Sequence, residues 1–250
     1  MRDPETEASA QILVVVSGLG CPRGGLGSPR HRERRRRTPL KLYLSSYRHG
    51  HDPEALRGLV GRSGTAALIF NACDGYGRDR LQKLPRERDD LQQRGFDCEE
   101  LDLRLYFDDF DGLCDRVARY DVLWVVGGNA FVLAKAMTAS RFARAVEAPI
   151  AEERLVYAGY SAGTCATAPD LEGIQLMDDP ALRPDGYPAS VTATTLAWVP
   201  WRIVPHWQSD HPAARDADRA VEYLLARNLA FKTLRDGQAL IVEGGRWRVI

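Results

Sequence analysis

The sequence predicts an α/β fold of three layers, αβα, with a largely parallel sheet and additional antiparallel strands near the C-terminus. From Leu40 onward, short apolar or β-branched runs alternate with amphipathic stretches of helical length, which is typical of parallel strands joined by helices. Residues 122–126 are apolar throughout, as a strand covered on both faces requires. Two short apolar runs flank Gly244 and Gly245, which predicts an antiparallel hairpin.

In the first half of this region, strands and helices are expected to alternate. We expect strands at residues 40–44, 66–70, 96–103, 122–126 and 155–158. We expect helices at residues 52–60, 78–94, 109–119, 129–137 and 141–152. Pro53 suits the first turn of the first helix, and Gly95 can end the second. The strand at 96–103 is polar, so we place it at an edge of the sheet.

The second half is less regular. Residues 192–204 are rich in β-branched and aromatic side chains, which predicts an antiparallel excursion. A helix is expected at 212–227 with Pro212 in its first turn, followed by short strands at 232–234, 239–242 and 247–250. Neither an internal repeat nor a linker interrupts the chain after residue 40, so residues 40–250 are predicted to form one domain.

Charge is unevenly distributed. The 34 basic and 34 acidic side chains cancel, but residues 1–39 carry eight Arg against four acidic residues, which makes this segment +4 and the remainder −4. The segment is also rich in Gly and Pro, so a flexible leader is expected there. Zero net charge gives no support to nucleic-acid binding, and no apolar run approaches the roughly 20 residues of a membrane span. We expect a cytoplasmic protein with neither partner, as a monomer or homodimer.

Cysteine and histidine spacing gives no sign of a disulfide framework or a metal site. The five cysteines are an odd number and contain no C-x-x-C pair, and the five histidines contain no H-E-x-x-H. We therefore expect reduced thiols, no metal and no organic cofactor.

Two loops follow central strands, where ligands bind in sheets of this kind. The first is GGN at residues 127–129, whose glycines can present bare backbone N–H groups to an oxygen. The same residues could simply form a tight turn, with Asn129 as the helix N-cap. The second is GYSAG at residues 159–163, which fits G-x-S-x-G, a serine at a sharp strand-to-helix turn. Ser161 is therefore predicted to be a nucleophile rather than a plain turn serine.

A serine hydroxyl needs a base to accept its proton, and the base needs an acid to orient it. His206 is the best candidate base because it follows an apolar strand, in IVPHW at residues 203–207. His211, beside Pro212, is the runner-up. The residue pattern leaves the orienting acid open among Asp178, Asp179, Asp210 and Asp236.

Four motifs together resemble those of the aspartyl dipeptidase (dipeptidase E) and cyanophycinase family of serine peptidases: GGN at 127–129, GYSAG at 159–163, PHW at 205–207 and DG at 236–237. The resemblance extends from Leu40 to the C-terminus. It implies a sheet like that of class I glutamine amidotransferases. It also implies Ser161 as nucleophile, His206 as base and Asp236 as the acid, where the dipeptidase has a glutamate.

The resemblance implies further site residues. Backbone N–H groups of Gly128 and Ala162 would form the oxyanion hole, and Asp178 falls where the family has another active-site aspartate. In the dipeptidase, an arginine on the helix after the histidine is implicated in holding the substrate's aspartyl carboxylate. Substrate contacts are therefore assigned to Arg215, Arg219 and Asn129.

The expected function is serine-type hydrolysis of short peptides through an acyl-enzyme on Ser161, with N-terminal Asp-X as a candidate substrate. Three alternatives stay open: a β-linked Asp-Arg polymer as substrate, carboxypeptidase-type action, and an amidotransferase-like binding module without catalysis.

Overall fold

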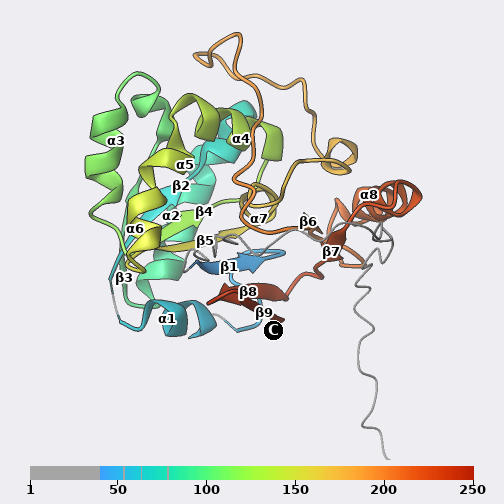
Figure 1. Cartoon of the computed structure of the whole chain (residues 1–250), viewed down its shortest axis with the longest axis horizontal. Helices are drawn as coiled ribbons and strands as arrows, with labels where there is room; N and C mark the ends of the chain where they lie inside the picture. Colours follow the sequence, from blue (N-terminus) through green and yellow to red (C-terminus); the bar gives the residue numbers. More distant parts are fainter. Residues whose placement is uncertain (1–39, 53, 63, 78) are drawn as a thin grey trace, which may run out of the picture.

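The computed structural model describes residues 40–52, 54–62, 64–77 and 79–250, so the predicted leader at 1–39 lies outside the described residues. At the centre is a seven-stranded sheet in the order β3-β2-β4-β5-β1-β8-β9 (Figure 1). Its strands are β1 (Lys41–Ser45), β2 (Gly64–Ile69), β3 (Phe96–Glu100), β4 (Val122–Val125), β5 (Val156–Tyr160), β8 (Ala239–Glu243) and β9 (Arg246–Val249). The predicted fold class is confirmed, because β1 to β5 pair in parallel whereas β8 pairs antiparallel with β1 and β9.

Helices pack on both faces of this sheet. Those that do so are α1 (Glu54–Val60), α2 (Asp79–Gln92), α3 (Phe110–Val117), α4 (Ala130–Ala139), α5 (Phe142–Ala145), α6 (Glu147–Ala151) and α7 (Ala162–Cys165). A further helix, α8 (Ala214–Ala226), and the 3₁₀ turns η1 (Asn71–Tyr76), η2 (Leu103–Tyr106) and η3 (Ile174–Leu176) complete the helical elements of the described residues. No helix in the described ranges has the length and apolar character needed to cross a membrane.

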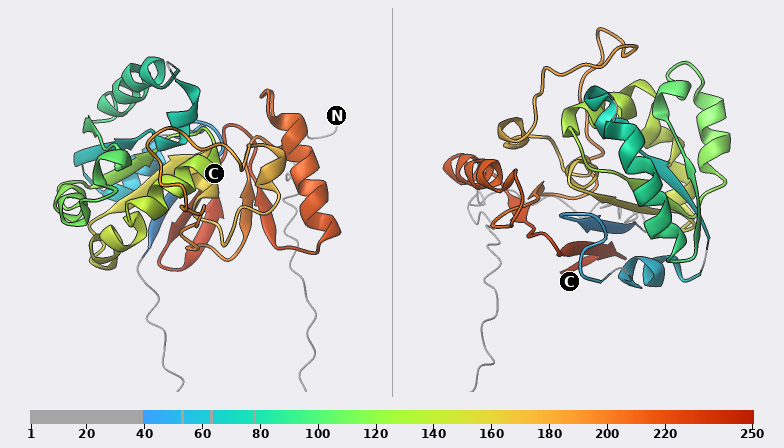
Figure 2. Two further views of the ribbon diagram at one scale, coloured as in Figure 1. Left: turned by 90° about the horizontal axis from the view of Figure 1, so that it is seen from above. Right: turned by 180° about the vertical axis from the view of Figure 1, so that it is seen from behind.

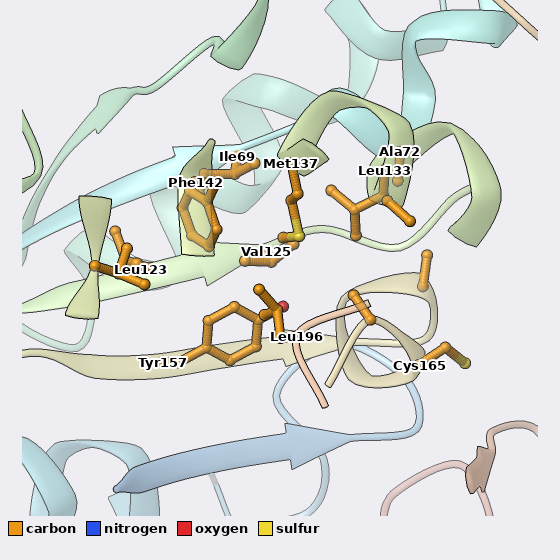
Figure 3. Packing of buried hydrophobic residues seen from close by; sticks show 14 of the residues in the cluster. Ile69, Ala72, Leu123, Val125, Leu133, Met137, Phe142, Tyr157, Cys165 and Leu196 are labelled. Atoms are coloured by element: carbon orange, nitrogen blue, oxygen red, sulfur yellow. The ribbon is translucent and has the colours of Figure 1, made fainter. Parts of the chain in front are cut away.

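The core is divided by the sheet into two clusters, because successive strand residues point to opposite faces. In β1, Leu42 and Leu44 belong to the cluster that α3 to α7 cover, whereas Tyr43 belongs to the cluster that α1 and α2 cover. Figure 3 shows part of the first cluster, with the side chains of Phe142, Tyr157 and Val125 among its buried residues. Both clusters are well buried, so the strand ends that carry the site are held by a rigid sheet.

A second, two-stranded sheet lies beside the main one. It consists of β6 (Arg202–Val204) and β7 (Phe231–Thr233), which pair in parallel with Val204 opposite Thr233. Helix α8 packs against this sheet through the apolar side chains Ala217, Ala220, Val221 and Leu224. Figure 2 shows α8 and these strands standing to one side of the main sheet.

The predicted antiparallel excursion at residues 192–204 is wrong. Only Arg202–Val204 forms a strand there, and it pairs in parallel. The preceding residues bond instead to the end of α7 and the residues after it: the N–H groups of Leu196 and Trp198 donate to the carbonyls of Ala166 and Thr167. The apolar side chains in this segment contribute packing rather than strand pairing, as Trp198 does edge-on to Tyr157.

Three predicted boundaries also change. The single helix at 141–152 is two short helices, because Pro149 has no N–H with which to continue α5. Pro212 precedes α8 rather than lying in its first turn, since the helix begins at Ala214. The strand at 96–103 ends at Glu100, and Asp102 then caps the turn η2 by accepting from the N–H of Arg104.

Candidate active site

Ser161 lies at a sharp turn between β5 and α7. Its φ of 50° and ψ of −111° are unfavourable for a residue with a Cβ, so the surrounding structure must hold the turn. Two contacts do so. The N–H of Ser161 donates to the carbonyls of Ser45 and Ser46 at the end of β1. Gly163 approaches β4 so closely that a Cβ on it would lie 2.4 Å from the carbonyl oxygen of Val125.

A continuous pair of hydrogen bonds connects Ser161 to an acid. The Oγ of Ser161 lies 3.0 Å from Nε2 of His206, and Nδ1 of His206 lies 2.7 Å from Oδ1 of Asp236. His206 follows β6 and Asp236 follows β7, and because these strands are parallel their carboxyl ends meet at the same edge. His206 is buried, so its ring is largely removed from competing water.

Ser46 joins the two sheets at this point. Its hydroxyl donates to Oδ1 of Asp236 at 2.7 Å and also lies 3.2 Å from the carbonyl of Leu234. The same hydroxyl accepts from the backbone N–H of His206 at 2.8 Å. A single buried serine on β1's side of the site therefore positions both the base and the acid. No motif in the sequence pointed to it.

The environment of Asp236 favours its ionised form. Burial alone would raise the pKa of this carboxyl, but hydrogen bonds from His206 and Ser46, with the charges of His206 and His211, hold the pKa below its ordinary value. Its backbone N–H donates to Oγ of Ser209, which fixes the loop that carries it. An ionised carboxylate at Nδ1 keeps the proton of a neutral His206 on Nδ1, which leaves Nε2 free to accept from Ser161.

A pocket of about 330 Å³ opens over Ser161. Its walls include Gly128, Ala162 and His206 together with Tyr47, Tyr76, Lys83, Arg86, Asp178 and His211. A larger cavity of about 680 Å³, lined by Trp198, Trp201 and Trp247, shares no lining residue with this pocket. The smaller pocket is the candidate active site because it alone of the two contains the serine and histidine.

Gly128 and Ala162 line the same pocket as Ser161. A Cβ on Gly128 would lie 2.4 Å from the carbonyl oxygen of Ala72, so only glycine fits this close approach. Ala162 is the first residue of α7, where backbone N–H groups have no acceptor within the helix. Both residues line the pocket that contains Ser161, and their role in an oxyanion hole stays a prediction.

Asp178 also lines the pocket, but it does not hold His206, whose Nδ1 is bonded to Asp236. One carboxylate oxygen of Asp178 accepts from the N–H of Ala130 at 2.8 Å, at the start of α4. Burial raises the pKa of Asp178 to about 6, although this bond and the charge of His206 oppose the rise. A half-buried carboxylate that lines the pocket can bind a cationic group of a ligand.

His211, the second candidate base, lines the pocket, whereas the three residues expected to contact substrate, Asn129, Arg215 and Arg219, do not. Asn129 caps α4, since its side chain accepts from the N–H groups of Phe131 and Val132. Arg215 and Arg219 do not line the pocket, and Arg219 forms an ion pair with Asp216 on the same helix. The remaining candidate acids also lie elsewhere: Asp210 is exposed, and the side chain of Asp179 accepts from the N–H of Ala181.

Two cations on α2, Lys83 and Arg86, line the pocket instead. Arg86 is paired with the fully buried Glu87, which also accepts from the hydroxyl of Tyr160 and the indole N–H of Trp124. These bonds attach α2 to β5 beside the serine. In the sequence, Lys83 and Arg86 look like ordinary solvated charges of an amphipathic helix, and no signal distinguishes them.

Comparison with known proteins assigns the family. The sequence profile of peptidase family S51 matches residues 75–250, more than half of the 250 residues. The chain belongs to peptidase family S51. It is a serine-type peptidase, and the predicted membership in the aspartyl dipeptidase family is confirmed. The chain is also 28% identical over 153 residues to an uncharacterized peptidase of Pasteurella multocida (strain Pm70), covering 61% of this chain and 69% of that protein.

Two solved structures share the fold of this S51 peptidase. A protein of Listeria monocytogenes EGD-e, described as a candidate peptidase E, has a TM-score of 0.64 at 21% identity, covering 84% of this chain and 98% of its own. A peptidase from an acI-B1 Actinobacterium has a TM-score of 0.65 at 15% identity, covering 84% and 87%. At these identities the likeness concerns the fold alone.

Proposed function

We propose that Ser161, His206 and Asp236 are the catalytic triad of this serine-type peptidase. The observation that carries the proposal is the unbroken series of hydrogen bonds from Asp236 through His206 to Ser161, at 2.7 and 3.0 Å. Both distances are short enough for proton transfer without rearrangement. The strained turn at Ser161 also exposes its hydroxyl to the pocket, as a nucleophile requires.

In this mechanism, Oγ of Ser161 attacks the scissile carbonyl carbon while Nε2 of His206 takes the hydroxyl proton. The negative charge moves to the carbonyl oxygen, where the N–H groups of Gly128 and Ala162 stabilise it. His206 then gives the proton to the leaving amine, which leaves an ester on Ser161. A water molecule, deprotonated by His206, hydrolyses that ester by the same steps in reverse.

For the substrate, we propose a short peptide with a free N-terminus and an acidic first residue. Lys83 offers positive charge to a side-chain carboxylate, and Arg86, although its Nη2 is paired with Glu87, adds further guanidinium N–H donors. Asp178 offers negative charge to the α-ammonium group. The three charges lie around one pocket, which favours a small zwitterionic acidic ligand over a long polymer.

A substrate panel tests this proposal. Peptides of the Asp-X, Glu-X, Asn-X and N-acetyl-Asp-X types should separate by kcat/KM, with Asp-X or Glu-X hydrolysed fastest and the acetylated peptide slowest. Preference for Asn-X, or for a blocked peptide, would contradict the assignment of the charges. Rapid cleavage of β-linked Asp-Arg polymer, or release of C-terminal residues from long peptides, would favour the corresponding alternative.

Single variants test which cations are used. Lys83→Gln and Arg86→Gln are expected to raise KM for Asp-X by roughly 10- to 100-fold, the range of one or two lost charge-assisted bonds, with little effect on Ala-X. Arg215→Gln and Arg219→Gln are matched controls from α8 and should behave as the wild type. A raised KM for Asp-X in the α8 variants alone would indicate that the carboxylate-binding site lies on α8 instead.

Labelling with a fluorophosphonate tests whether the triad works at all. Wild-type protein should react at Ser161 and the Ser161→Ala variant should not. An unlabelled wild type that also hydrolyses none of the peptides would indicate a binding module instead.

A further inference from the structure

A second histidine ring lies flat against the proposed catalytic base. The rings of His206 and His211 are stacked with centroids 3.7 Å apart and planes 8° from parallel. Tyr47 meets both rings at steep angles, 64° for His206 and 58° for His211. All three line the pocket. The stack covers one face of the His206 ring, so the rotation of that ring about its χ2 angle would require the ring of His211 to move.

The ring of His211 is itself fixed by a backbone bond. The N–H of Ala213, one residue before α8, donates to Nδ1 of His211 at 3.1 Å. An Nδ1 that accepts carries no proton, so the neutral ring has its hydrogen on Nε2. Burial lowers the pKa of His211, and the charge of His206 lowers it further, while Asp236 opposes the shift. The ring stacked on His206 is therefore the uncharged form at neutral pH.

The orientation of the His206 ring needs support from a neighbour because His206 does not lie in a regular strand. It lies two residues past the end of β6, at a positive φ of 61°. Its two ring nitrogens must face Ser161 and Asp236 at once, which only one orientation of the plane allows. The two hydrogen bonds define the orientation within the ring plane, and a flat neighbour is what limits tilting out of it.

We propose that His211 is a positioning residue that holds the plane of the His206 imidazole and presents an uncharged aromatic face to the imidazolium formed during catalysis. This inference rests on the proposed triad. A neutral π-face attracts a cation, whereas a charged neighbour at 3.7 Å would oppose protonation of His206. Histidine suits the position because it combines a flat ring with an acceptor that the N–H of Ala213 can fix.

Three substitutions of His211 distinguish the contribution of its aromatic ring from that of its hydrogen-bond acceptor Nδ1. His211→Phe keeps a flat ring and loses the acceptor, His211→Asn keeps an acceptor near Nδ1 and loses the ring, and His211→Ala loses both. Stacking of aromatic rings supports a change of about tenfold in rate, so the Asn and Ala variants should lose about tenfold in kcat. The Phe variant should stay within about threefold of the wild type. The loss should fall on kcat rather than on KM.

The control is Asp210→Ala, which changes an exposed residue of the same loop and leaves both rings in place. It should keep the wild-type kcat. A variant series in which Asn retains kcat and Phe loses it would overturn the inference, since the bond to Ala213 and not the stack would then matter. Equal kcat in all variants would overturn it as well.

The turnover of the His211 variants alone would not distinguish a failure of this inference from a failure of the proposed triad. Ser161→Ala and Asp236→Asn are therefore measured in the same assay. If these two keep their turnover, the triad itself is wrong. If they lose it and the His211 variants do not, only the role of His211 is wrong.

Nitrogen-15 NMR of histidine-labelled wild-type protein supplies a readout that needs no variant to fold. At pH 7, His211 should appear as the neutral ring with its proton on Nε2. A doubly protonated His211 at that pH, or one with its proton on Nδ1, would overturn the neutral stack. The acid limb of kcat/KM should coincide for wild type and His211→Phe. A shift of this limb to higher pH in the variant would show that His211 carries a positive charge in the wild type, since the loss of that charge would ease protonation of His206.

Discussion

The three residues of the proposed triad come from regions of very different construction. Ser161 follows β5, inside a seven-stranded sheet that is buried on both faces. His206 and Asp236 follow β6 and β7, which are three residues each and form a sheet of their own. In the first region, dense packing keeps the backbone of Ser161 in its strained conformation. The second holds its residues by a few polar bonds, so its geometry depends on contacts that single substitutions can remove.

Ser46 makes several of the hydrogen bonds that cross between the two regions. It lies just past β1, beside the centre of the main sheet, yet its hydroxyl binds Asp236 and the backbone of His206. The comparison indicates that the chemistry lies at a junction: the main sheet fixes where the serine is, and the junction fixes how well the base meets it. Substitutions in the main sheet, in the small sheet and at the junction should therefore have different effects on kcat and on stability.

The largest effect is expected on the main-sheet side. Ser161→Ala removes the nucleophile and should lower kcat by roughly 10⁴- to 10⁶-fold. The melting temperature should stay close to that of the wild type, because the neighbouring backbone bonds and packing do not involve the hydroxyl that is lost. Hydrolysis at a near-normal rate by a folded variant would contradict the triad.

On the side of the small sheet, Asp236→Asn should lower kcat by roughly 10³- to 10⁴-fold, because an amide allows the wrong tautomer of His206. Asp178→Asn is the matched comparison, since Asp178 lines the pocket but only Asp236 contacts Nδ1 of His206. It should act mainly on KM. A larger loss of kcat at Asp178 than at Asp236 would transfer the orienting role.

At the junction, Ser46→Ala should lower kcat by about 10- to 100-fold and the free energy of unfolding by about 1–3 kcal/mol, since a buried N–H loses its acceptor. The neighbouring Ser45 is an equally buried control, and its hydroxyl bonds to backbone carbonyls of Arg48 and Gly159. Ser45→Ala should destabilise the protein with little change in kcat. A similar kcat in the two variants would contradict the proposal that Ser46 positions His206 and Asp236 for catalysis.

The sequence predicted the main sheet well because its strands are bounded by glycine-rich turns and carry apolar runs that only burial explains. It also placed Ser161, His206 and Asp236 at strand ends, and parallel strands bring such ends together. The catalytic roles of these residues stay predictions until the variants are measured.

The sequence did not predict which charged residues outside the strand ends line the pocket. Arg215 and Arg219 lie on α8, whose buried residues face β6 and β7, and the helix pattern alone does not say which side meets the pocket. Lys83 and Arg86 reach it only because Glu87 and Tyr160 bring α2 beside β5. The segment at 192–201 failed for a related reason: β-branched and aromatic residues favour strands, yet here they pack against the main sheet and α7.

The smallest predicted effect concerns pH and the side of the pocket that Asp178 forms. Because burial raises the pKa of Asp178 to about 6, its carboxylate loses charge as the pH falls below that value. A substrate ammonium group binds the ionised form, so the Kd of an Asp-X peptide should rise as pH falls from 7 to 5, by roughly tenfold. Binding is best measured by calorimetry on Ser161→Ala, where hydrolysis does not interfere.

The same titration on the double variant Ser161→Ala, Asp178→Asn isolates the cause. With an amide at 178, Kd should be weaker at pH 7 and nearly constant down to pH 5, since the group that titrates is gone. The peptide's own side-chain carboxyl changes little in charge above pH 5, because its ordinary pKa is about 4. An equally steep dependence in the double variant would assign the titration to another group and would leave the α-ammonium site without its proposed anion.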